Sequence, residues 1–409
     1  MIRHTFKLIW NRKRRNLLLI GEVFLAFIVL FVVSTALITG LLRYMKPLGF
    51  SYANTWILFT NRGGGGDDLF RKSPAEDARK TLAQIRREME AIPEINRVSF
   101  LSSNYPYSHS TWSTGFKWAK QNIQAWVWLA DDNLADVLGL KILEGRWFNR
   151  EDDASPRRAI VLTKTMKEEL FGDQSPIGKI QTDDDGDEER VIVGVVDDYR
   201  YKGEFETYRG GFFERHPIED TSSNLLSMAV FSVQEGSDAR VEEAILKQIQ
   251  SVAPNWIFRI ETLGDKRKAY MKDNFLSAGV FVTIAGFLIF NVALGLFGVL
   301  WQSISRRHGE IGLRRAIGAN RSHIAGQVVV ESLVLATFAI LAGILVAVQV
   351  PVLRLDTTLT GMRNPLPGLT YVLAMACAAL LIYLLVSLCA LYPSQLAARV
   401  QPAAALHDD

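Results

Sequence analysis

The run Gly172-Asp-Gln-Ser-Pro-Ile-Gly-Lys-Ile180 is the part of the sequence that comes nearest to a phosphate-binding loop. Such a loop needs four residues between its first glycine and its Gly-Lys pair, followed by a Ser or Thr that binds magnesium. Here five residues separate Gly172 from Gly178, and Ile180 occupies the magnesium position. The run is therefore predicted to be a structural turn, and we expect no ATP hydrolysis by this chain.

The acidic run from Asp183 to Glu189 suggests calcium binding, but its neighbours have the wrong chemistry. With Gly186 at the glycine position of an EF-hand loop, Gln181 would be the first ligand and Ile192 the last. Neither residue supplies the carboxylate that those positions need. A solvated hairpin turn with Asp185 and Gly186 at its tip is predicted instead. Weak surface binding of a divalent ion is the alternative.

The remaining reactive side chains form no catalytic or metal-binding pattern that we recognise. HExxH and GxSxG motifs are absent from the sequence. The two cysteines, Cys377 and Cys389, are twelve residues apart in one apolar stretch, so they cannot pair within one helix. We therefore predict neither a catalytic residue nor a bound metal. The six histidines are scattered along the chain, at positions 4, 109, 216, 308, 323 and 407.

Aromatic side chains are concentrated between residues 105 and 128. They are Tyr105, Tyr107, Trp112, Trp118, Trp126 and Trp128. Such a group is typical of a surface that binds an apolar or peptidic ligand. It is also typical of a packed core, and the sequence favours this second interpretation.

The segment 305–323 is rich in arginine and has the pattern of a short helix. Leu313 and Ile317 recur at helical spacing, and Gly318 with Asn320 indicates a helix end followed by a new helix start. A short helix that exposes apolar and arginine side chains is suited to docking on a soluble partner. A turn that only adheres to the membrane is the alternative.

The chain has 409 residues, of which 49% are hydrophobic and 22% charged, so neither a fully membrane-buried nor a disordered protein fits. The apolar residues gather in four stretches that are long enough to cross a bilayer as helices. We place these helices at residues 17–44, 274–304, 324–352 and 369–391. Their few polar side chains, Glu22, Asn291 and Glu331, are candidates for a role in the membrane. Glu331 is expected to pair with Arg306 or Arg307, or else to be hydrated among the lipid headgroups.

Basic residues decide the orientation, because short loops rich in Lys and Arg stay in the cytoplasm. Residues 1–16 hold six Lys or Arg and no acid, and residues 303–324 hold five Arg against one acidic residue. Both segments are predicted to be cytoplasmic, the first as an amphipathic helix on an anionic lipid surface. Residues 45–273 and the short loop 353–368 are then external, and the tail 392–409 is cytoplasmic. This makes the chain a multi-pass protein with both termini in the cytoplasm.

The external segment of 229 residues is predicted to be a large α+β domain. Ser73-Pro-Ala-Glu76 is a capping box that opens a helix to about residue 91. Asp131 is expected to cap a short helix that ends at Gly139. A helix from Glu261 is expected to continue into the second membrane helix as a stalk. Further elements are predicted as strands at 122–130 (with one buried face), 158–163 and 191–196, and as helices at 164–171 and 238–252.

Several motifs resemble the MacB/FtsX family of ABC transporter permeases, the type VII ABC superfamily. The signature-like segment is Arg307-His-Gly-Glu310-Ile-Gly-Leu-Arg314-Arg-Ala316-Ile-Gly318-Ala319. The run from Tyr392 to Leu406 is similar to the C-terminal tail of that family. Residues similar to its MacB-like periplasmic core domain are Gly145-Arg-Trp-Phe148, Leu170-Phe-Gly172, Pro176-Ile-Gly-Lys179 and Val193-Gly-Val-Val196.

The resemblance implies a permease subunit in the cytoplasmic (inner) membrane, which dimerises with itself or with a paralogous permease. It implies a separate cytoplasmic ABC ATPase that uses ATP and magnesium, while this chain binds no cofactor. The family's coupling element, which contacts the ATPase, corresponds here to Arg307, Glu310, Ile311, Gly312, Leu313, Arg314, Arg315, Ala316, Ile317 and Gly318.

Three functions follow from these observations. The first is export or extraction of a hydrophobic or peptidic substrate by mechanotransmission, in which ATP hydrolysis moves the external domain. Its partners are membrane lipid and, for an efflux system, a periplasmic adaptor or outer-membrane component, with no nucleic acid. The second is FtsX-like regulation of a cell-wall hydrolase or sensor kinase. The third, a membrane-anchored receptor or enzyme acting alone, leaves residues 306–318 unexplained.

Overall fold

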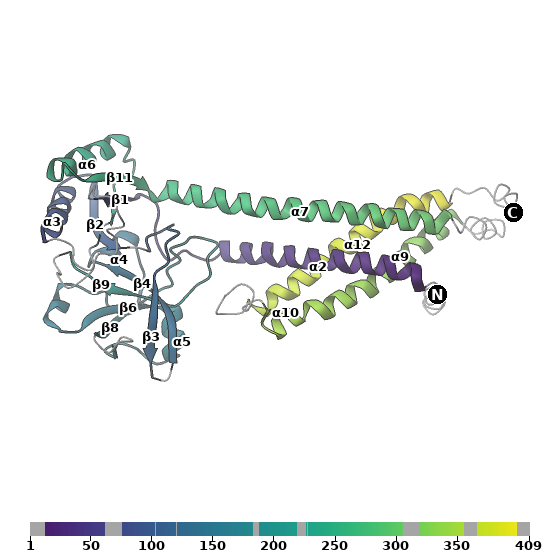
Figure 1. Cartoon of the computed structure of the whole chain (residues 1–409), viewed down its shortest axis with the longest axis horizontal. Coiled ribbons are helices and arrows are strands. Elements are labelled where there is room, and N and C mark those ends of the chain that lie inside the picture. The colour runs from purple at the N-terminus through teal and green to yellow at the C-terminus, as the bar shows by residue number, and fades with distance from the viewer. Residues whose placement is uncertain are drawn as a thin grey trace. The chain divides into compact units, whose positions relative to one another are not determined.

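The computed structural model (Figure 1) describes residues 13–61, 76–102, 104–119, 121–182, 188–218, 226, 228–305, 320–355 and 366–398. The chain divides into two compact units. The sheet domain is Arg43–Asn274, and the helical unit combines Met1–Leu42 with Phe275–Asp409. Both ends of the chain therefore contribute to the helical unit.

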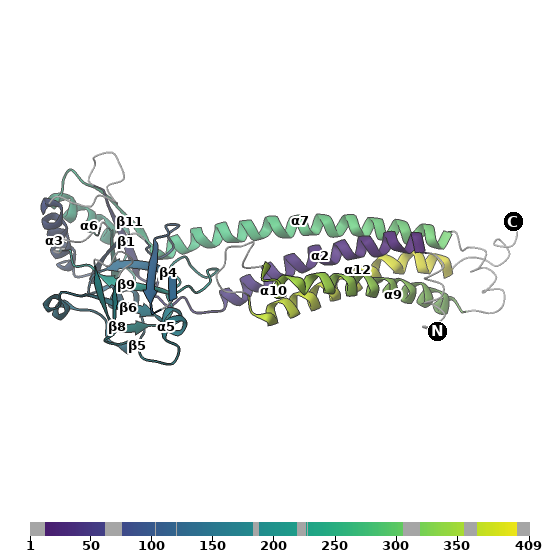
Figure 2. The ribbon, with the colours of Figure 1, turned by 60° about the horizontal axis from the view of Figure 1, so that its bottom comes forward.

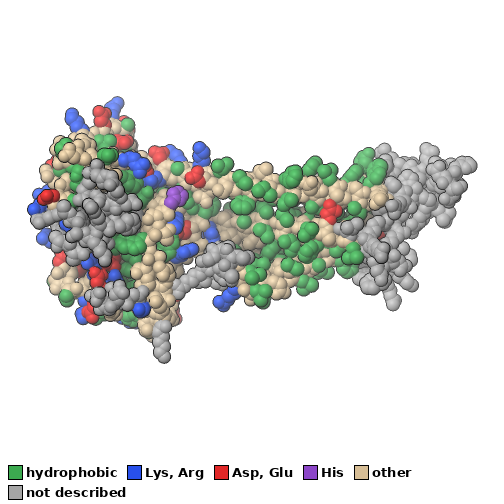
Figure 3. Space-filling model, viewed as in Figure 1, with side chains coloured by type: hydrophobic (Ala, Val, Ile, Leu, Met, Phe, Trp, Pro, Cys, Tyr) green, Lys and Arg blue, Asp and Glu red, His purple; other side chains and the backbone are tan. Residues whose placement is uncertain are grey.

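Long apolar helices make up the described part of the helical unit. They are α2 (Lys13–Tyr44), α7 (Leu263–Ser305), α9 (Arg321–Ala347) and α12 (Gly368–Ala398), with the short α10 (Gln349–Val352) after α9. Four stretches are long and apolar enough to cross a bilayer, namely Leu19–Tyr44, Leu263–Val299, His323–Val352 and Gly368–Gln395. Figure 2 shows the helices alongside one another, and Figure 3 shows hydrophobic side chains over their surface. The predicted set of four membrane helices is confirmed.

Small residues let these helices approach one another closely. A Cβ atom at Gly295 of α7 would lie 1.7 Å from Oε1 of Glu22 on α2. A Cβ atom at Gly343 of α9 would lie 2.3 Å from a ring carbon of Phe27 on α2. Either glycine could be enlarged only if the facing Glu22 or Phe27 side chain moved, so α2 packs closely against α7 and α9 at these points.

The sheet domain is built on a mixed sheet with the strand order β11-β1-β10-β2-β4-β9-β6-β8-β5, in which β3 also pairs with β4 and β7 with β8. Most pairs are antiparallel, whereas β4–β9 and β6–β8 are parallel. The pair β2–β4 joins two halves of the sheet through Leu101–Ala130 and Ser102–Leu129. The strands are β1 (Thr55–Asn61), β2 (Ile95–Ser102), β3 (Ser113–Trp118), β4 (Gln121–Ala130), β5 (Ile142–Gly145), β6 (Arg158–Thr163), β7 (Ile180–Thr182), β8 (Glu189–Val196), β9 (Gly211–Arg215), β10 (Met228–Val233) and β11 (Ile257–Thr262).

Helices cover parts of this sheet, and their bounds agree with the sequence predictions to within a few residues. They are α3 (Glu76–Glu90), α4 (Leu134–Leu138), α5 (Lys164–Phe171) and α6 (Ala239–Val252), with the 3-10 helix η2 (Arg150–Ala154). The predicted capping residues Ser73 and Pro74 lie outside the described part of the chain. Figures 1 and 2 show α3 and α6 together beside the half of the sheet that contains β1 and β2. The predicted α+β class is confirmed.

The sheet has a packed core on each face. Ile123, Ala125, Val127 and Leu129 of β4 point into one core, as predicted. Trp126 and Trp128 alternate with them and are buried in the second core, only 4% and 2% exposed. The prediction of one buried face for this strand was therefore wrong, because Tyr199 and Tyr201 cover the tryptophans.

Asp131 does not occupy the predicted capping position of α4. The N-cap residue is Asn133, and the helix ends as predicted at Gly139 in the left-handed conformation. The buried Asp131 carboxylate instead accepts hydrogen bonds from Ser99 Oγ at 2.6 Å and from the Phe100 N–H at 2.7 Å. Desolvation raises its pKa despite an ion pair with Arg86. Through these hydrogen bonds, Asp131 connects β2 to the end of β4.

The start of α7 also differs from the prediction. Glu261 and Thr262 form the end of β11 and pair with β1, so the helix begins at Leu263. Thr262 Oγ1 accepts a hydrogen bond of 2.9 Å from the Asp265 N–H, which satisfies a donor in the first turn. The predicted continuity is confirmed, because one helix of 43 residues follows.

Substitution Gly194→Ala tests the close approach between β5 and β8. A Cβ at Gly194 would lie 2.1 Å from the carbonyl oxygen of Arg146, so the strands must separate. We expect a loss of about 1 to 3 kcal/mol in the free energy of unfolding. Thermal unfolding of the full chain in detergent, followed by tryptophan fluorescence, measures this loss of stability. Gly264→Ala at the start of α7 is the control, since its Cβ meets nothing closer than 3.7 Å. Equal midpoints for the two variants would contradict the packing described here.

Candidate functional site

The predicted coupling residues lie outside the residues that the structure describes. These are Arg307, Glu310, Ile311, Gly312, Leu313, Arg314, Arg315, Ala316, Ile317 and Gly318. Residues 1–12, 356–365 and 399–409 of the predicted cytoplasmic and external segments are also outside it. The coupling segment is bounded by Ser305 at the end of α7 and by Asn320, which is the N-cap residue of α9 as predicted.

The three polar membrane residues occupy different surroundings. Glu22 is half-buried, with its carboxylate against Gly295. Asn291 is exposed on α7, and its side-chain amide donates 2.8 Å to the carbonyl of Phe287 one turn earlier. Glu331 is half-buried on α9. Its pairing with Arg306 or Arg307 stays a prediction, because both arginines lie outside the described residues.

The phosphate-loop-like run forms the predicted structural turn. The Lys179 N–H donates 3.1 Å to the carbonyl of Pro176, and the Gly178 N–H donates 2.8 Å to that of Ile192. Lys179 Nζ lies 4.7 Å from the ring centre of Phe171 and 5.7 Å from that of Trp118. The lysine thus packs against aromatic side chains of the domain itself.

The acidic run lies at the connection between β7 and β8, which pair as an antiparallel hairpin. Thr182 pairs with Glu189, as a hairpin turn between them requires, while residues 183–187 are outside the described residues. Over the described residues, no group of three His, Cys, Asp or Glu is arranged to hold a metal ion.

The aromatic group at 105–128 is part of the core. Tyr107, Trp126 and Trp128 are buried, and the other three pack against the two cores from partly buried positions. Trp128 stacks on Phe213 with ring centres 4.8 Å apart. The interpretation as core packing is therefore confirmed.

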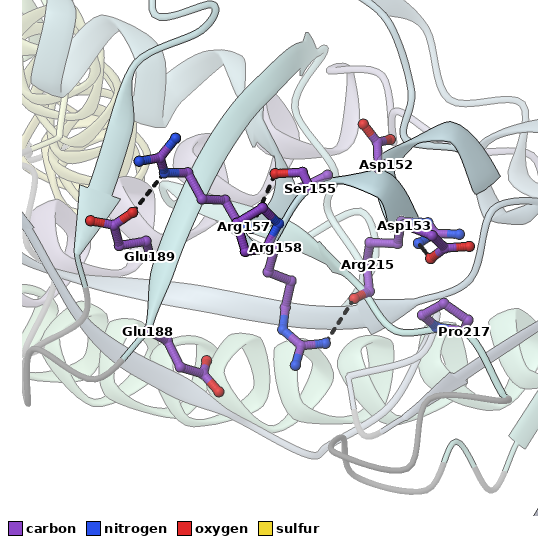
Figure 4. Close-up of a pocket in the computed structure, with 11 residues that line it drawn as sticks. Asp152, Asp153, Ser155, Arg157, Arg158, Glu188, Glu189, Arg215 and Pro217 are labelled. Atoms are coloured by element: carbon purple, nitrogen blue, oxygen red, sulfur yellow. Dashed lines mark hydrogen bonds and ion pairs between the residues drawn. The ribbon is translucent and has the colours of Figure 1, made fainter.

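A charged pocket lies where β6 and β8 begin and β9 ends, with a volume of about 370 Å³. Figure 4 shows Arg157 reaching Glu189, and Arg158 reaching the carbonyl of Arg215. The charged side chains that line it are Asp152, Asp153, Arg157, Arg158, Glu188, Glu189 and Arg215. The sequence analysis did not find this pocket, because its walls come from three separate segments and each segment alone is an ordinary charged loop.

Glu214 organises the charges beneath the pocket. Its buried carboxylate accepts from Arg190 Nε at 2.9 Å and His216 Nε2 at 2.8 Å, and it pairs with Arg158 at 3.3 Å. Arg158 also lies 3.3 Å from His216 Nδ1. Arginine has only donors, so Nδ1 must accept and Nε2 carries the proton that Glu214 receives. Desolvation alone would raise the pKa of Glu214, but the His216 hydrogen bond and the arginine charges lower it to about 2.

The rim of the pocket is mostly acidic, because it exposes the carboxylates of Asp153, Glu188 and Glu189 alongside Arg157, which is 41% exposed and pairs with Glu189. Arg215 is held by both carboxylate oxygens of Asp132, at 2.7 and 3.1 Å, and by Asp153. Asp153, Glu188 and Glu189 are about half exposed, at 54%, 50% and 51%. The buried arginines are neutralised within the domain, and the Glu214 pKa lies far from the neutral range that a general base needs. This arrangement suits a contact surface for a polar or basic partner rather than a catalytic centre.

Acid titration tests the role of Glu214. Because its folded-state pKa lies below its ordinary value of 4.5, its stabilising effect is present above pH 4.5 and is lost as pH falls towards 2. We expect Glu214→Gln to lose about 2 to 3 kcal/mol at neutral pH and to depend less on pH in that window. Denaturant unfolding at pH 7, 4.5 and 3 measures both effects. Glu188→Gln, whose carboxylate is half exposed, is the control and should resemble the wild type.

Two family models match the chain. The FtsX-like permease C-terminal model matches residues 282–402, and the MacB-like periplasmic core domain model matches residues 27–248. YknZ of Bacillus subtilis, named an uncharacterized ABC transporter permease, is 24% identical over 218 residues, which are 52% of this chain and 54% of YknZ. The macrolide export ATP-binding/permease protein MacB of Aggregatibacter actinomycetemcomitans is 24% identical over 220 residues, which are 52% of this chain and 33% of MacB. The chain thus spans about half of one relative and a third of the other.

Two solved structures are also similar to it. The periplasmic region of MacB from Actinobacillus actinomycetemcomitans has a TM-score of 0.38 at 16% identity, covering 55% of this chain and 96% of that one. The extracellular domain of YknZ has a TM-score of 0.34 at 17% identity, covering 50% and 100%. The core-domain match at residues 27–248 extends over more than half of the 409 residues. Together with the permease match at 282–402, it shows that this chain belongs to the MacB/FtsX-type family of ABC transporter permeases.

Proposed function

We propose that the chain is the transmembrane subunit of an ABC transporter and works with a separate cytoplasmic ATPase. The observation that carries this proposal is the continuity of α7. This helix leaves the sheet domain at β11 and reaches the predicted coupling segment after 43 residues. At 1.5 Å per residue it is about 65 Å long, so it extends well beyond a hydrocarbon core of about 30 Å. A stiff element therefore connects the predicted ATPase contact to the external domain.

In the proposed mechanism, two permease subunits pair in the inner membrane as a homodimer or a heterodimer. Closure of two ATPases around ATP and magnesium draws the coupling segments together and tilts the α7 helices. The external domains then change their spacing, which is mechanotransmission. Charged residues are scarce in the spans, since Phe275–Ile304 and Leu369–Leu391 contain none. This scarcity supports a mechanism without a polar substrate path through the lipid.

The proposed activity is the export or extraction of a hydrophobic or peptidic substrate from the external side. The basic segments 1–16 and 303–324 support an orientation with both termini in the cytoplasm. In that orientation the sheet domain faces the periplasm, where the acidic pocket rim is available to an adaptor or an outer-membrane component. This chain supplies no cofactor, and ATP is bound by the partner.

Two substitutions test the ATPase contact. Leu313→Asp and Ile317→Asp place a charge on the apolar side of the predicted coupling helix. We expect each to reduce co-purification of the ATPase at least about tenfold, since an unpaired buried charge costs several kcal/mol. The measurement is the ratio of the two proteins after affinity purification in detergent. Leu359→Asp, in the predicted external loop, is the matched control. An intact complex with both coupling variants would refute the assignment.

Cross-linking from the pocket rim distinguishes export from regulation. A photo-activatable amino acid at Glu188, which is 50% exposed, should capture a periplasmic adaptor, an outer-membrane component or a lipoprotein in intact cells. The same probe at Arg259, 66% exposed on β11, should capture less, because it lies outside the pocket. A cell-wall hydrolase or sensor kinase captured at Glu188 would replace the export proposal with the FtsX-like regulatory function.

A further inference from the structure

Residues 197–210 connect β8 to β9 and contain the most deeply buried charged side chain among the described residues of the sheet domain. The Arg200 side chain is 0% exposed. An arginine is seldom buried to this extent unless all its donors have partners. The partners that Arg200 uses show what this connection does.

The Arg200 side chain holds the polypeptide that leaves α2. Nη1 donates to the carbonyl oxygens of Lys46 at 2.9 Å and Pro47 at 3.3 Å, which lie two and three residues beyond the end of α2 at Tyr44. Its backbone N–H donates 3.0 Å to the carbonyl of Leu48. Three consecutive carbonyls just after a helix end are thus satisfied by one residue that is far away in sequence.

The other N–H groups of the Arg200 guanidinium donate to carbonyl groups of the loop that contains Arg200. Nε and Nη2 donate to the carbonyl of Glu206 at 3.2 and 2.9 Å, and Nη2 also donates to that of Glu204. The guanidinium lies 5.2 Å from the ring centre of Tyr208, whose hydroxyl donates 3.0 Å to the carbonyl of Pro47. The planar guanidinium therefore lies between two loop segments and fixes the distance between them. A flexible lysine could not do this as well.

The same loop holds the first turns of α7. The buried Glu204 carboxylate pairs with Arg267 of α7. Phe205 and Tyr270 have ring centres 6.3 Å apart. A Cβ at Gly203 would lie 2.6 Å from the Tyr270 ring, so the loop backbone lies directly against this side chain of α7. Gly203 has φ of +105°, a conformation that glycine tolerates.

The sheet and helix α5 also anchor the loop. Tyr199 and Tyr201 pack edge-on against Trp128 and Trp126, with ring centres 5.2 and 4.7 Å apart. Asp198 accepts hydrogen bonds from the N–H and hydroxyl of Thr165, both at 2.8 Å. The loop therefore contacts the end of α2, the start of α7 and the sheet at the same time.

We propose that Arg200 is a positioning residue for force transmission, because it locks the exit of α2 and the start of α7 to the sheet through the loop 197–210. The proposal rests on the mechanotransmission function proposed above. Residues 45–54 link α2 to β1 without a helix or strand. Arg200 holds the carbonyls at the start of this linker, where it would be freest to absorb movement of the membrane helices. With the lock in place, the residues that follow α2 and the first turns of α7 stay attached to the sheet.

Hydrogen exchange of the full chain in lipid nanodiscs tests the lock directly. We expect Arg200→Met to accelerate exchange about tenfold in peptides covering residues 45–54 and 197–208, through local opening, and to leave β6 and β10 unchanged. Arg209→Met is the matched control, because this cation lies on the same loop and its side chain is exposed. Unchanged exchange in Arg200→Met would overturn the proposal. Faster exchange throughout the sheet would also overturn it, since Arg200 would then be a general core residue.

If Arg200→Met does not yield folded protein, Tyr208→Phe replaces it in the same experiment. This variant removes one hydroxyl and its bond to Pro47. We expect a smaller acceleration that is confined to residues 45–50. No acceleration in Tyr208→Phe would overturn the proposal.

Transmission is then measured with the purified ATPase partner. We expect Arg200→Met to retain ATP hydrolysis and to lose most of the ATP-driven movement between labelled external domains, because the linker after α2 and the start of α7 are no longer held to the sheet. A short thiol cross-linker between Lys46→Cys and Tyr208→Cys, whose side chains are in contact, should restore the movement in a chain whose native cysteines are replaced by alanine. Full movement without the lock, or no rescue by the cross-link, would overturn the proposal. If wild-type domains do not move at all, the proposed function fails, while hydrogen exchange still decides the lock.

Discussion

A helix inside lipid must satisfy its own backbone hydrogen bonds, and this constraint governs the architecture of the chain. Breaking one backbone bond in the hydrocarbon region costs several kcal/mol, so α7 resists sharp bending there. Its first residue, Leu263, directly follows Thr262, the last residue of β11. A strand that is hydrogen-bonded into a sheet is thereby joined to a stiff helix without a linker residue. In the proposed mechanism, a displacement at the Ser305 end is carried along α7 to this junction, where the Arg200 loop keeps the helix from pivoting on the sheet.

The bundle that guides α7 is held mainly by close packing. Gly295 and Gly343 bring α7 and α9 against α2, and Thr337 Oγ1 and Tyr383 Oη join α9 to α12 by a hydrogen bond of 3.0 Å. Van der Waals contacts between helices in lipid resist separation, but they lack the directional rigidity of a polar network. Helices packed in this way can slide or tilt at modest cost. In the proposed transporter subunit, the rigid elements are thus the individual helices and the sheet. The contacts that can slide lie between helices.

Local sequence patterns predicted much of this fold. The features that they did not predict depend on contacts between residues far apart in the sequence. The four membrane helices follow from apolar length, and Gly139 ends α4 because its φ of +64° suits a residue without a side chain. Glu261 and Thr262 were predicted to be helical, because hydrophobic periodicity is ambiguous over a few residues. They are part of a strand because they pair with β1. No sequence pattern identified Arg200 as important, because its partners Lys46 and Pro47 are 154 and 153 residues away. The charged pocket was missed for the same reason, as its walls come from three segments.

The charged pocket and the Arg200 loop lie at opposite ends of the same strands. β8 starts at Glu189 beside the pocket and ends at Val196, directly before the Arg200 loop. β9 returns from Gly211, after that loop, to Arg215 at the pocket. Eight residues of strand span about 26 Å. Both strands pair with β6, and Glu214 of β9 is bonded to Arg190 of β8 and Arg158 of β6. These buried ion pairs prevent the three strands from shearing past one another. In the proposed mechanism, a displacement of the loop is transmitted along these strands to the pocket.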